Sequence, residues 1–458
     1  MQQVVADLHL HSKYSRAVSQ DMILPLMARV GKQKGIDILS ASDWTHPLWF
    51  KEISALLEEE EEGLYCLKTE KREEKKTLFF LATEIASIYK QGEKLRRIHN
   101  LVCAPNLSVA EKISKSLLER GCNLMSDGRP IIGLSSKQLL ELILEVDERS
   151  LFIPCHVWTP HFGIYGSASG FDSLKEAFGE LSDYIFGIET GLSSDPEMNW
   201  QIDELTNRSI LSFSDAHSLP KMGREATVFV RKDGISNDKF QMSNKQITYQ
   251  DIRKAIMKKS DAWRIGYTIE FYPEEGKYHF SGHRNCGVFR DPSQTKKEGN
   301  ICPVCKRRLT EGVLHRVEQL ADRLNKDATL VKENSYGLRW FTDKTKHHPP
   351  YVKLVPLNEI IAESIASTVF SQRVKETFSL LCDTFGSEIT VLLKTPVSDI
   401  QKTVGEKIAQ GVQKVRKGEI AIRPGYDGEY GKVTIWQEGE SENQSLSNDP
   451  PPQLSFEI

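Results

Sequence analysis

The first 230 residues alternate short apolar stretches with amphipathic helical patterns, and this alternation limits the folds open to the chain. The apolar stretches have the length and composition of buried strands; they are 4–10, 35–41, 78–82, 98–104, 151–155, 184–188 and 209–213. Residues 136–149 give the clearest helical pattern, an apolar stripe behind a serine N-cap. Strands that alternate with helices form parallel sheets, so we expect an α/β fold with its strands closed into a barrel.

Side chains that can bind metal ions follow directly after these strands. The first strand ends in Asp7-Leu-His-Leu-His-Ser12, where strand geometry places His9 and His11 on one face, with Asp7 behind them to orient a ring. Polar residues that simply cap a strand end are the alternative for this motif alone. The later strands add Asp43, Glu84, His99, His156, Glu189, Asp215 and His217. Because catalytic groups of α/β barrels gather at the carboxyl ends of strands, these nine residues predict a multinuclear metal centre.

The order His-x-His, Asp, Glu, His, His, Glu and Asp-x-His resembles the polymerase and histidinol phosphatase (PHP) superfamily of metal phosphoesterases. The resemblance covers residues 1–230 and implies a distorted (β/α)7 barrel with two to three divalent ions. It implies that one ion binds His9, His11, Glu84 and Asp215, that Glu84 bridges to a second ion on His99 and His156, and that Asp43 and His217 face a third. The family has a histidine where this chain has Trp44, with His46 two residues further on, and this departure weakens the third site.

The chemistry of a phosphodiester explains the need for such a centre. The diester is an anion that repels hydroxide, and divalent ions neutralise it, activate a bound water and align the attacking and leaving oxygens. An imidazole-rich ligand set favours Zn²⁺ or Mn²⁺ over Mg²⁺. We therefore expect a phosphoester hydrolase whose catalytic residues are Asp215, Glu84, His9 and His11.

A second metal motif lies further along the chain. His283-x-x-Cys286 is followed, after fifteen residues, by Cys302-Pro-Val-Cys305. The two pairs offer three sulfurs and one nitrogen, the donor set of a closed structural zinc site with one ion. A redox-active cysteine pair is the alternative. The other five cysteines show no pairing pattern, which suits a reducing cytoplasm.

The region around this motif is basic. Residues 231–355 carry 25 Lys and Arg against 15 Asp and Glu, in a chain of net charge −3. Basic residues interleaved with aromatic ones predict a nucleic-acid surface, with a solvated surface or the core of a small domain as the alternatives. The candidate DNA-binding residues here are Arg284, Arg290, Lys306, Arg307 and Arg308.

Residues 355–417 are predicted to be helical, and their later part resembles the second half of a helix-hairpin-helix, which binds DNA phosphates through backbone amides. Its turn keeps only Gly405, and Lys407 follows as a further candidate DNA contact; an apolar core stripe is the alternative. From residue 437 the chain is polar and is predicted to be disordered. Residues 453–458 resemble the peptides by which bacterial repair enzymes hold the sliding clamp, with an incidental chain end as the alternative.

This order of modules resembles the endonuclease Q family of DNA-repair enzymes. Two further sequence segments support the resemblance: Leu-Thr-Glu-Gly-Val-Leu at 309–314 and Pro-Gly-Tyr-Asp-Gly-Glu-Tyr at 424–430. It implies an endonuclease that cuts double- or single-stranded DNA on the 5′ side of hypoxanthine, uracil, xanthine or an abasic site, leaving a 3′-hydroxyl and a 5′-phosphate. We expect the damaged nucleotide to be flipped out. The loops 159–171 and 191–199 follow two predicted ligands, so the candidate lesion-reading residues are Ser193, Ser194, Tyr165 and Gly166.

We expect four parts: a PHP-type barrel (1–230), a basic zinc-binding module (231–350), a helical DNA-binding domain (351–436) and a disordered tail (437–458). The absence of a membrane-length apolar stretch and of a signal-peptide pattern predicts a cytoplasmic, nucleoid-associated monomer. Two other functions fit parts of the sequence. A PHP phosphatase of the histidinol-phosphate type leaves the zinc motif and the basic region unexplained, and a non-catalytic DNA-binding factor does not need the retained ligands.

Overall fold

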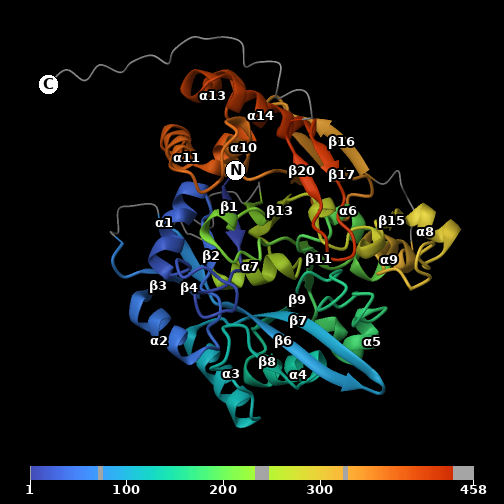
Figure 1. Cartoon of the computed structure of the whole chain (residues 1–458). Helices are drawn as coiled ribbons and strands as arrows, with labels where there is room; N and C mark the ends of the chain where they lie inside the picture. The colour runs from blue at the N-terminus through green and yellow to red at the C-terminus, as the bar shows by residue number, and fades with distance from the viewer. Residues whose placement is uncertain (1, 71–75, 233–246, 323–328, 437–458) are drawn as a thin grey trace.

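The structure is a computed structural model that describes residues 2–70, 76–232, 247–322 and 329–436 (Figure 1). Its strands are β1 (Gln3–Asp7), β2 (Ile38–Ser40), β3 (Leu57–Glu61), β4 (Leu64–Leu67), β5 (Leu78–Phe80), β6 (Ala82–Gln91), β7 (Lys94–Cys103), β8 (Ile131–Ile132), β9 (Leu151–Pro154), β10 (Gly187–Glu189), β11 (Ser209–Leu211), β12 (Ala226–Arg231), β13 (Trp263–Glu270), β14 (Ser281–His283), β15 (Val288–Arg290), β16 (Thr329–Glu333), β17 (Arg339–Asp343), β18 (Tyr351–Lys353), β19 (Ala421–Arg423) and β20 (Lys432–Thr434). Its α-helices are α1 (Leu24–Lys34), α2 (Pro47–Leu56), α3 (Leu107–Glu119), α4 (Ser136–Val146), α5 (Leu174–Phe178), α6 (Pro196–Asn199), α7 (Tyr249–Ile256), α8 (Pro292–Glu298), α9 (Val313–Leu320), α10 (Leu357–Ser364), α11 (Gln372–Phe385), α12 (Glu388–Lys394), α13 (Val397–Val404) and α14 (Glu406–Lys417). No helix among these residues is both long and apolar enough to cross a bilayer.

Ten strands form one sheet, in the order β16-β17-β18-β13-β12-β1-β2-β5-β4-β3. β1, β2 and β5 are parallel neighbours, and β12 lies antiparallel beside β1. β13 is antiparallel to β12 and parallel to β18. The strands β1, β2, β5, β13 and β18 therefore end at the same edge of the sheet, and their loops emerge together there.

The remaining strands of the first 230 residues form two smaller sheets, β8-β6-β7-β9 and the parallel pair β10-β11. The mixed α/β architecture expected from the sequence is therefore present. The described strands of the first 230 residues are divided among three hydrogen-bonded sheets and do not form one continuous ring, so a closed (β/α)7 barrel stays a prediction.

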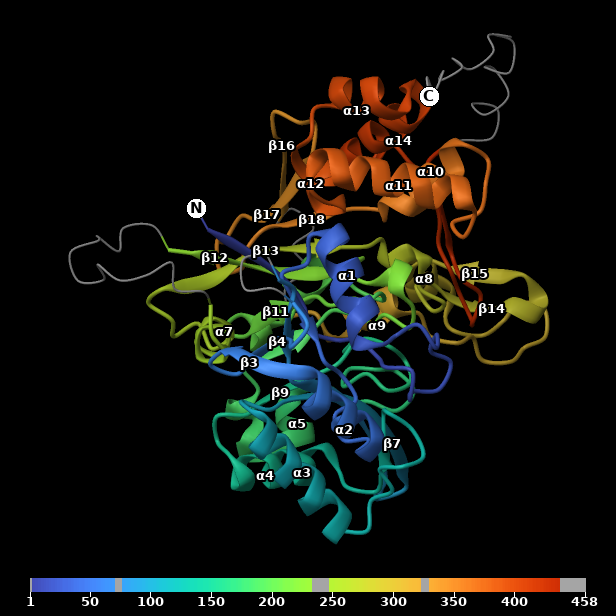
Figure 2. The ribbon, with the colours of Figure 1, turned by 90° about the vertical axis from the view of Figure 1, so that its left-hand side faces the viewer.

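The central strands of the large sheet are buried on both faces. Successive side chains of β1 point to opposite sides: Val5 packs against the helices of the C-terminal region, whereas Val4 and Ala6 pack on the side of α7. Figures 1 and 2 show α10–α14 on one side of the sheet and α2–α5 on the other. Burial on both faces explains why these strands read as continuous apolar stretches.

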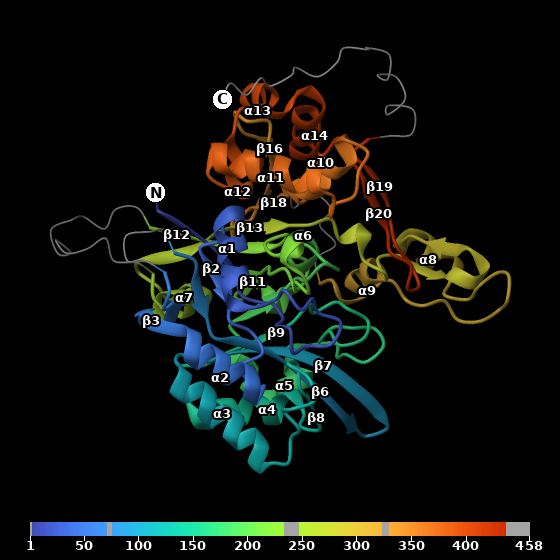
Figure 3. The same ribbon diagram turned by 60° about the vertical axis from the view of Figure 1, so that its left-hand side comes forward.

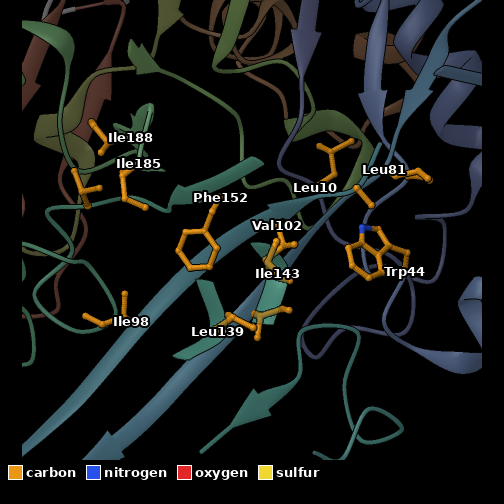
Figure 4. Close-up of a cluster of buried hydrophobic side chains, with 14 of the residues drawn as sticks. Leu10, Trp44, Leu81, Ile98, Val102, Leu139, Ile143, Phe152, Ile185 and Ile188 are labelled. Atoms are coloured by element: carbon orange, nitrogen blue, oxygen red, sulfur yellow. The ribbon is translucent and has the colours of Figure 1, made fainter. Parts of the chain in front are cut away.

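A third core lies around β6, β7 and α4. Val102 and Phe152 from the strands meet Leu139 and Ile143, which are neighbours on one face of α4 (Figure 4). Ser135 caps α4 in a capping box with Gln138, as its sequence pattern predicts. This core supports the strands that carry the polar residues described below.

The sheet continues across the expected boundary at residue 230, because β12 pairs with β13 and residues 329–353 add β16–β18. The second metal motif instead projects from the molecule with β14, β15 and α8, as Figures 2 and 3 show. The acidic residues 58–61 form most of strand β3 (Leu57–Glu61). Their neighbour β4 is buried throughout and offers an edge with which this acidic strand pairs.

The C-terminal region is helical, as predicted, and consists of α10–α14. Lys34 of α1 and Glu388 of α12 form a buried ion pair of 2.6 Å that joins this region to the N-terminal part. Gly405 alone separates α13 from α14 and has a φ of +91°, a conformation that favours glycine.

Arg416 in α14 is buried despite its charge. Its guanidinium donates to the carbonyls of Val391, Leu392 and Thr395 at 2.6–2.8 Å, and to that of Tyr336 at 3.1 Å. These bonds close the end of α12, whose last carbonyls have no partner within the helix.

Arg416→Met is expected to lower the free energy of unfolding by about 3 kcal/mol, because several buried carbonyls lose their donor. Urea unfolding followed by circular dichroism measures the change. Lys402→Met, at an exposed position in α13, is the control and should alter stability by less than about 0.5 kcal/mol. Equal stability of the two variants would contradict this account of Arg416.

Candidate metal centre

The Glu84 carboxylate, at the third position of β6, is buried and shared by two groups of imidazoles. Its Oε1 lies 2.5 Å from His99 Nδ1 and 3.1 Å from His156 Nε2. Its Oε2 lies 3.3 Å from His11 Nε2 and 3.7 Å from His9 Nε2. One carboxylate therefore stands between two sets of nitrogen donors.

Asp215 completes the first set. Its Oδ1 lies 3.1 Å from His11 Nε2 and 3.8 Å from His9 Nε2. The donor atoms of each group lie within 4.8 Å of one another, a spacing at which one ion can be held; the groups are His9, His11, Glu84 and Asp215, and Glu84, His99 and His156. These are the first two ligand sets that the superfamily resemblance implies.

Left-handed backbone conformations bring several of these side chains together. Asp43, His156 and Asp215 have φ values of +39°, +30° and +46°. Non-glycine residues adopt such values at a cost of about 1–3 kcal/mol and do so mostly at functional sites. Each lies just after a strand, at the turn where the chain leaves the sheet. Gly191 packs directly against His156: a Cβ atom on residue 191 would lie 2.3 Å from the His156 Cβ and would clash with it. A glycine at position 191 therefore leaves room for the turn at His156.

Asp7 has a different role from the one predicted. Its carboxylate accepts hydrogen bonds from Ser214 N at 3.0 Å, from Ser214 Oγ at 2.6 Å and from Gly223 N at 2.8 Å. Burial raises its pKa to about 6, against the opposing effect of the Ser214 bonds. Asp7 therefore fixes the loop immediately before Asp215, instead of orienting an imidazole.

Two other carboxylates orient the imidazoles. The Nδ1 of His9 lies 2.9 and 3.0 Å from the Glu189 oxygens, and that of His11 lies 3.2 Å from Asp43 Oδ1. A proton held on Nδ1 by a carboxylate leaves the Nε2 lone pair facing the centre. Glu189 also accepts from His156 N at 3.0 Å. Asp43 and Glu189, predicted as metal ligands, thus contact the imidazoles on their Nδ1 sides. Glu189 also forms a metal-capable group with His9 and Cys155, so the role of these carboxylates as ligands stays a prediction.

The third predicted ion site is not assembled among the described residues. Asp43 belongs to none of the metal-capable groups there, and it also accepts from Ser12 N and Ser15 Oγ. His217 Nδ1 lies 2.9 Å from the Asp215 carbonyl oxygen. Trp44, at the departure from the family pattern, lies in the hydrophobic core shown in Figure 4. His46 Nε2 lies 3.3 Å from the Met125 carbonyl and does not replace it.

The electrostatics of the centre suit divalent cations. Burial opposes ionisation of Glu84, but the His99 imidazole and the Arg129 guanidinium hold its pKa well below the ordinary value. Burial likewise acts against Asp215, and His11 and His9 outweigh it, so its pKa is also lowered. Burial lowers the pKa of His99 to about 4. Burial also acts against protonation of His9 and His11, but the carboxylates of Glu189 and Asp215 outweigh it and raise both pKa values. A bound divalent cation would displace these protons, since metal ligands must be deprotonated.

Arg129 is a site residue that the sequence patterns did not single out. Its Nη1 lies 3.0 Å from Glu84 Oε2, and a quarter of its side chain is exposed. It lies in the loop before β8 and not at the end of a strand, so the rule that located the other residues misses it. The turn-forming Ser-Asp-Gly at 126–128 was the only signal.

Three of the four candidate lesion-reading residues are engaged within the protein. The Tyr165 hydroxyl donates to Glu204 at 2.8 Å, and its backbone amide donates to the Val157 carbonyl. The Ser194 hydroxyl donates to the Thr190 carbonyl at 3.0 Å. The Gly166 amide donates to the Gly163 carbonyl. Ser193, which is half-buried, is the remaining candidate.

The second metal motif forms a compact cluster. The donor atoms of His283, Cys286, Cys302 and Cys305 lie within 4.8 Å of one another. A tight turn after Cys302 holds two of them, because the Cys302 amide donates to the Arg307 carbonyl and the Lys306 amide donates to the Cys302 carbonyl. Three thiols and one imidazole fit a tetrahedral structural metal site.

The basic residues of this module fall into two groups. Arg284, Lys306, Arg307 and Arg308 are exposed. Arg290, predicted to contact DNA, is instead buried: it donates to the Gly299 carbonyl at 2.5 Å and forms an ion pair with Glu298 at 3.1 Å. It therefore stabilises the loop between α8 and the Cys302 turn. In α14, Lys407 Nζ lies 3.5 Å from the centre of the Trp436 ring.

Cys302→Ser is expected to lower the zinc content of the purified protein by one equivalent and to make residues 278–310 sensitive to protease, because a structural ion contributes folding free energy. Elemental analysis and limited proteolysis measure the two effects. Cys122→Ser, at a half-buried cysteine outside both clusters, is the control. Full zinc retention by Cys302→Ser would contradict the site.

Comparisons with known proteins place the chain among a small set of relatives. The family described as the MJ0043 C-terminal domain matches residues 356–419. The protein MJ0043 of Methanocaldococcus jannaschii is 31% identical over 300 residues, which cover 64% of this chain and 34% of that protein. This chain thus matches about a third of that relative's length. The protein YqxK of Bacillus subtilis is 28% identical over 455 residues, which cover 94% of this chain and all of YqxK.

Two solved structures resemble nearly the whole chain. The lesion-specific endonuclease PfuEndoQ from Pyrococcus furiosus superposes with a TM-score of 0.76 at 30% identity, over 95% of this chain and 96% of that one. An endonuclease Q bound to a 27-mer duplex with an abasic lesion at its active site gives the same TM-score and identity, over 97% of this chain and all of that one.

Proposed function

This chain belongs to the endonuclease Q family, and on that premise we propose that it is an endonuclease that cuts DNA at damaged nucleotides. The observation that carries the proposal is the Glu84 carboxylate, which stands between two donor groups in a protein of this family. The neighbour bound to duplex DNA with an abasic lesion supports damaged DNA as the substrate.

We propose that the reaction hydrolyses the phosphodiester 5′ of a deaminated base or an abasic site. Two divalent ions at the shared carboxylate would neutralise the diester and supply a water activated at neutral pH. Glu84 would be shared between the two ions, and Asp215 with His9 and His11 would hold one of them. Asp43 and Glu189 keep a proton on the Nδ1 atoms of His11 and His9, so that each Nε2 stays a lone-pair donor.

DNA binding is assigned to two surfaces. The zinc module offers the exposed cations Arg284, Lys306, Arg307 and Arg308, which suit contacts with phosphates. The start of α14 at Gly405 offers backbone amides for a further phosphate, as in a helix-hairpin-helix. A contact between residues 453–458 and a sliding clamp stays a prediction, because these residues lie outside the described ranges.

Flipping of the damaged nucleotide belongs to the same proposal. The candidate metal centre is formed by buried strand ends, and a strand that stays within a stacked duplex cannot reach so deep a site. A nucleotide that is flipped out of the duplex can reach it. The hydroxyls of Tyr165 and Ser194 already donate hydrogen bonds within the protein, so these two side chains are poor candidates for recognising the base. Ser193 is the candidate that remains.

A small-molecule phosphatase is the alternative, since the same donor groups can bind a phosphate monoester. It gives no role to the exposed cations of the zinc module. The deciding experiment incubates the protein with Mn²⁺ or Zn²⁺ and end-labelled duplexes that hold one deoxyinosine, one deoxyuridine, one abasic site or no lesion. We expect a single nick 5′ of the lesion and none in the undamaged duplex. Phosphate release from small monoesters, without a nick in any duplex, would favour the alternative.

Asp215→Asn is expected to reduce nicking by more than about 100-fold while DNA affinity changes little, because the amide is a poorer metal ligand than the carboxylate. Single-turnover nicking and fluorescence anisotropy measure the two quantities. Asp21→Asn, an exposed position, is the control. A variant that keeps a tenth or more of the normal rate would remove Asp215 from this role.

A further inference from the structure

Arg129 is anchored on the carboxylate that joins the two donor groups. Its Nη1 lies 3.0 Å from Glu84 Oε2, the oxygen that also faces His11. The guanidinium therefore lies at the candidate metal centre itself, within one contact of both donor groups. No other arginine or lysine makes such a contact among the residues that the structure describes.

The loop that carries Arg129 is fixed at several points. The Arg129 amide donates to Asp127 Oδ1 at 3.1 Å, and the Arg16 amide donates to the same oxygen at 3.3 Å. The Gly128 amide donates to the Tyr14 carbonyl. Gly128 also packs so closely on the centre that a Cβ there would lie 2.4 Å from Asp43 Oδ2. The guanidinium is thus held in place before any ligand binds, which lowers the entropic cost of using it.

Most of the donors of Arg129 remain available. Within the described ranges, Nη1 contacts Glu84, and no protein partner is recorded for Nε or Nη2. The side chain is a quarter exposed, so a ligand can approach the guanidinium while Nη1 stays paired with Glu84.

The charges at the candidate metal centre also favour an anionic ligand beside Arg129. Asp43 and Glu189 face imidazoles, so Glu84 and Asp215 are the carboxylates that face the two donor groups. Asp43 and Glu189 stay ionised when they accept from the imidazoles, so the charge of two divalent ions would balance all four carboxylates. The guanidinium of Arg129 then leaves one positive charge in excess. A cationic surplus at the open side of a centre suits an anionic ligand.

We propose that Arg129 is a further catalytic residue, whose guanidinium binds a non-bridging oxygen of the scissile phosphate. A planar guanidinium offers two parallel N–H donors, which match two phosphate oxygens. As water adds and the leaving oxygen departs, negative charge grows on the non-bridging oxygens, and a cation already in place stabilises that charge without reorganisation. The role deepens the proposed nuclease function and rests on it.

The test uses the metal-loaded protein and three variants. Arg129→Met removes the charge, Arg129→Lys keeps the charge but loses the fork, and Arg16→Met is the control. Arg16 is an arginine of the same loop network that pairs with Asp127 and is 74% exposed. Calorimetric titration with inorganic phosphate measures anion binding without any turnover, and elemental analysis measures bound metal.

We expect Arg129→Met to bind inorganic phosphate at least about tenfold more weakly, with unchanged metal content, while Arg16→Met binds as the unaltered protein does. Arg129→Lys should lose about 100-fold in kcat for lesion nicking with a smaller change in KM. Phosphate affinity of Arg129→Met equal to that of the unaltered protein would overturn the proposal. Loss of metal in step with activity would also overturn it, since Arg129 would then act only through Glu84.

The two proposals fail separately in this design. If the unaltered protein nicks damaged DNA and Arg129→Met nicks it equally well, the role of Arg129 is wrong and the nuclease function stands. If the unaltered protein nicks no DNA but its phosphate binding depends on Arg129, the nuclease function is wrong and the anion site stands.

Discussion

The position of one carboxylate, Glu84, decides how the rest of the candidate site is built. Each of its oxygens faces a different pair of imidazoles, at 2.5–3.7 Å. A buried carboxylate is stable only with positive or hydrogen-bonding partners, and this one draws them from β7, from the turns after β1 and β9, and from the loop before β8. The long hairpin β6–β7 holds Glu84 and His99 on adjacent strands, and the core of Figure 4 supports that hairpin.

Carboxylates away from the centre determine what the imidazoles can do. Glu189 and Asp43 fix the Nδ1 sides of His9 and His11, and Asp7 fixes the loop that presents Asp215. Each of these contacts joins segments far apart in sequence; the Asp7 contact to Ser214 spans 207 positions. The centre therefore depends on the completed fold and cannot be formed by any one segment of the chain.

The sequence predicts the nitrogen donors of the centre well, for a simple geometric reason. His9, His11, His99 and His156 lie at or near strand ends or on paired strands, and strand ends converge in an α/β protein. The sequence does not show whether a carboxylate also contacts an imidazole; Asp43 and Glu189, predicted as ligands, lie against the Nδ1 atoms of His11 and His9.

The sequence also does not show which polar side chains are buried in the folded protein. Arg290 has the composition of a phosphate contact, yet it is 6% exposed and bonds backbone carbonyls. Tyr165 is fully buried against Glu204. Arg129 shows the reverse case, since its loop carries no strand pattern and only the folded chain brings it to Glu84. The ten-stranded sheet that crosses residue 230 was likewise hidden, because β-strand pairing between distant segments leaves no local signal.

The most direct test of a two-ion centre bridged by Glu84 is anomalous X-ray diffraction from crystals grown with Mn²⁺. The account predicts two peaks on opposite sides of the Glu84 carboxylate, one beside His9, His11 and Asp215 and the other beside His99 and His156. A single peak away from Glu84, or a peak held by Asp43 and His217 without these two, would contradict it.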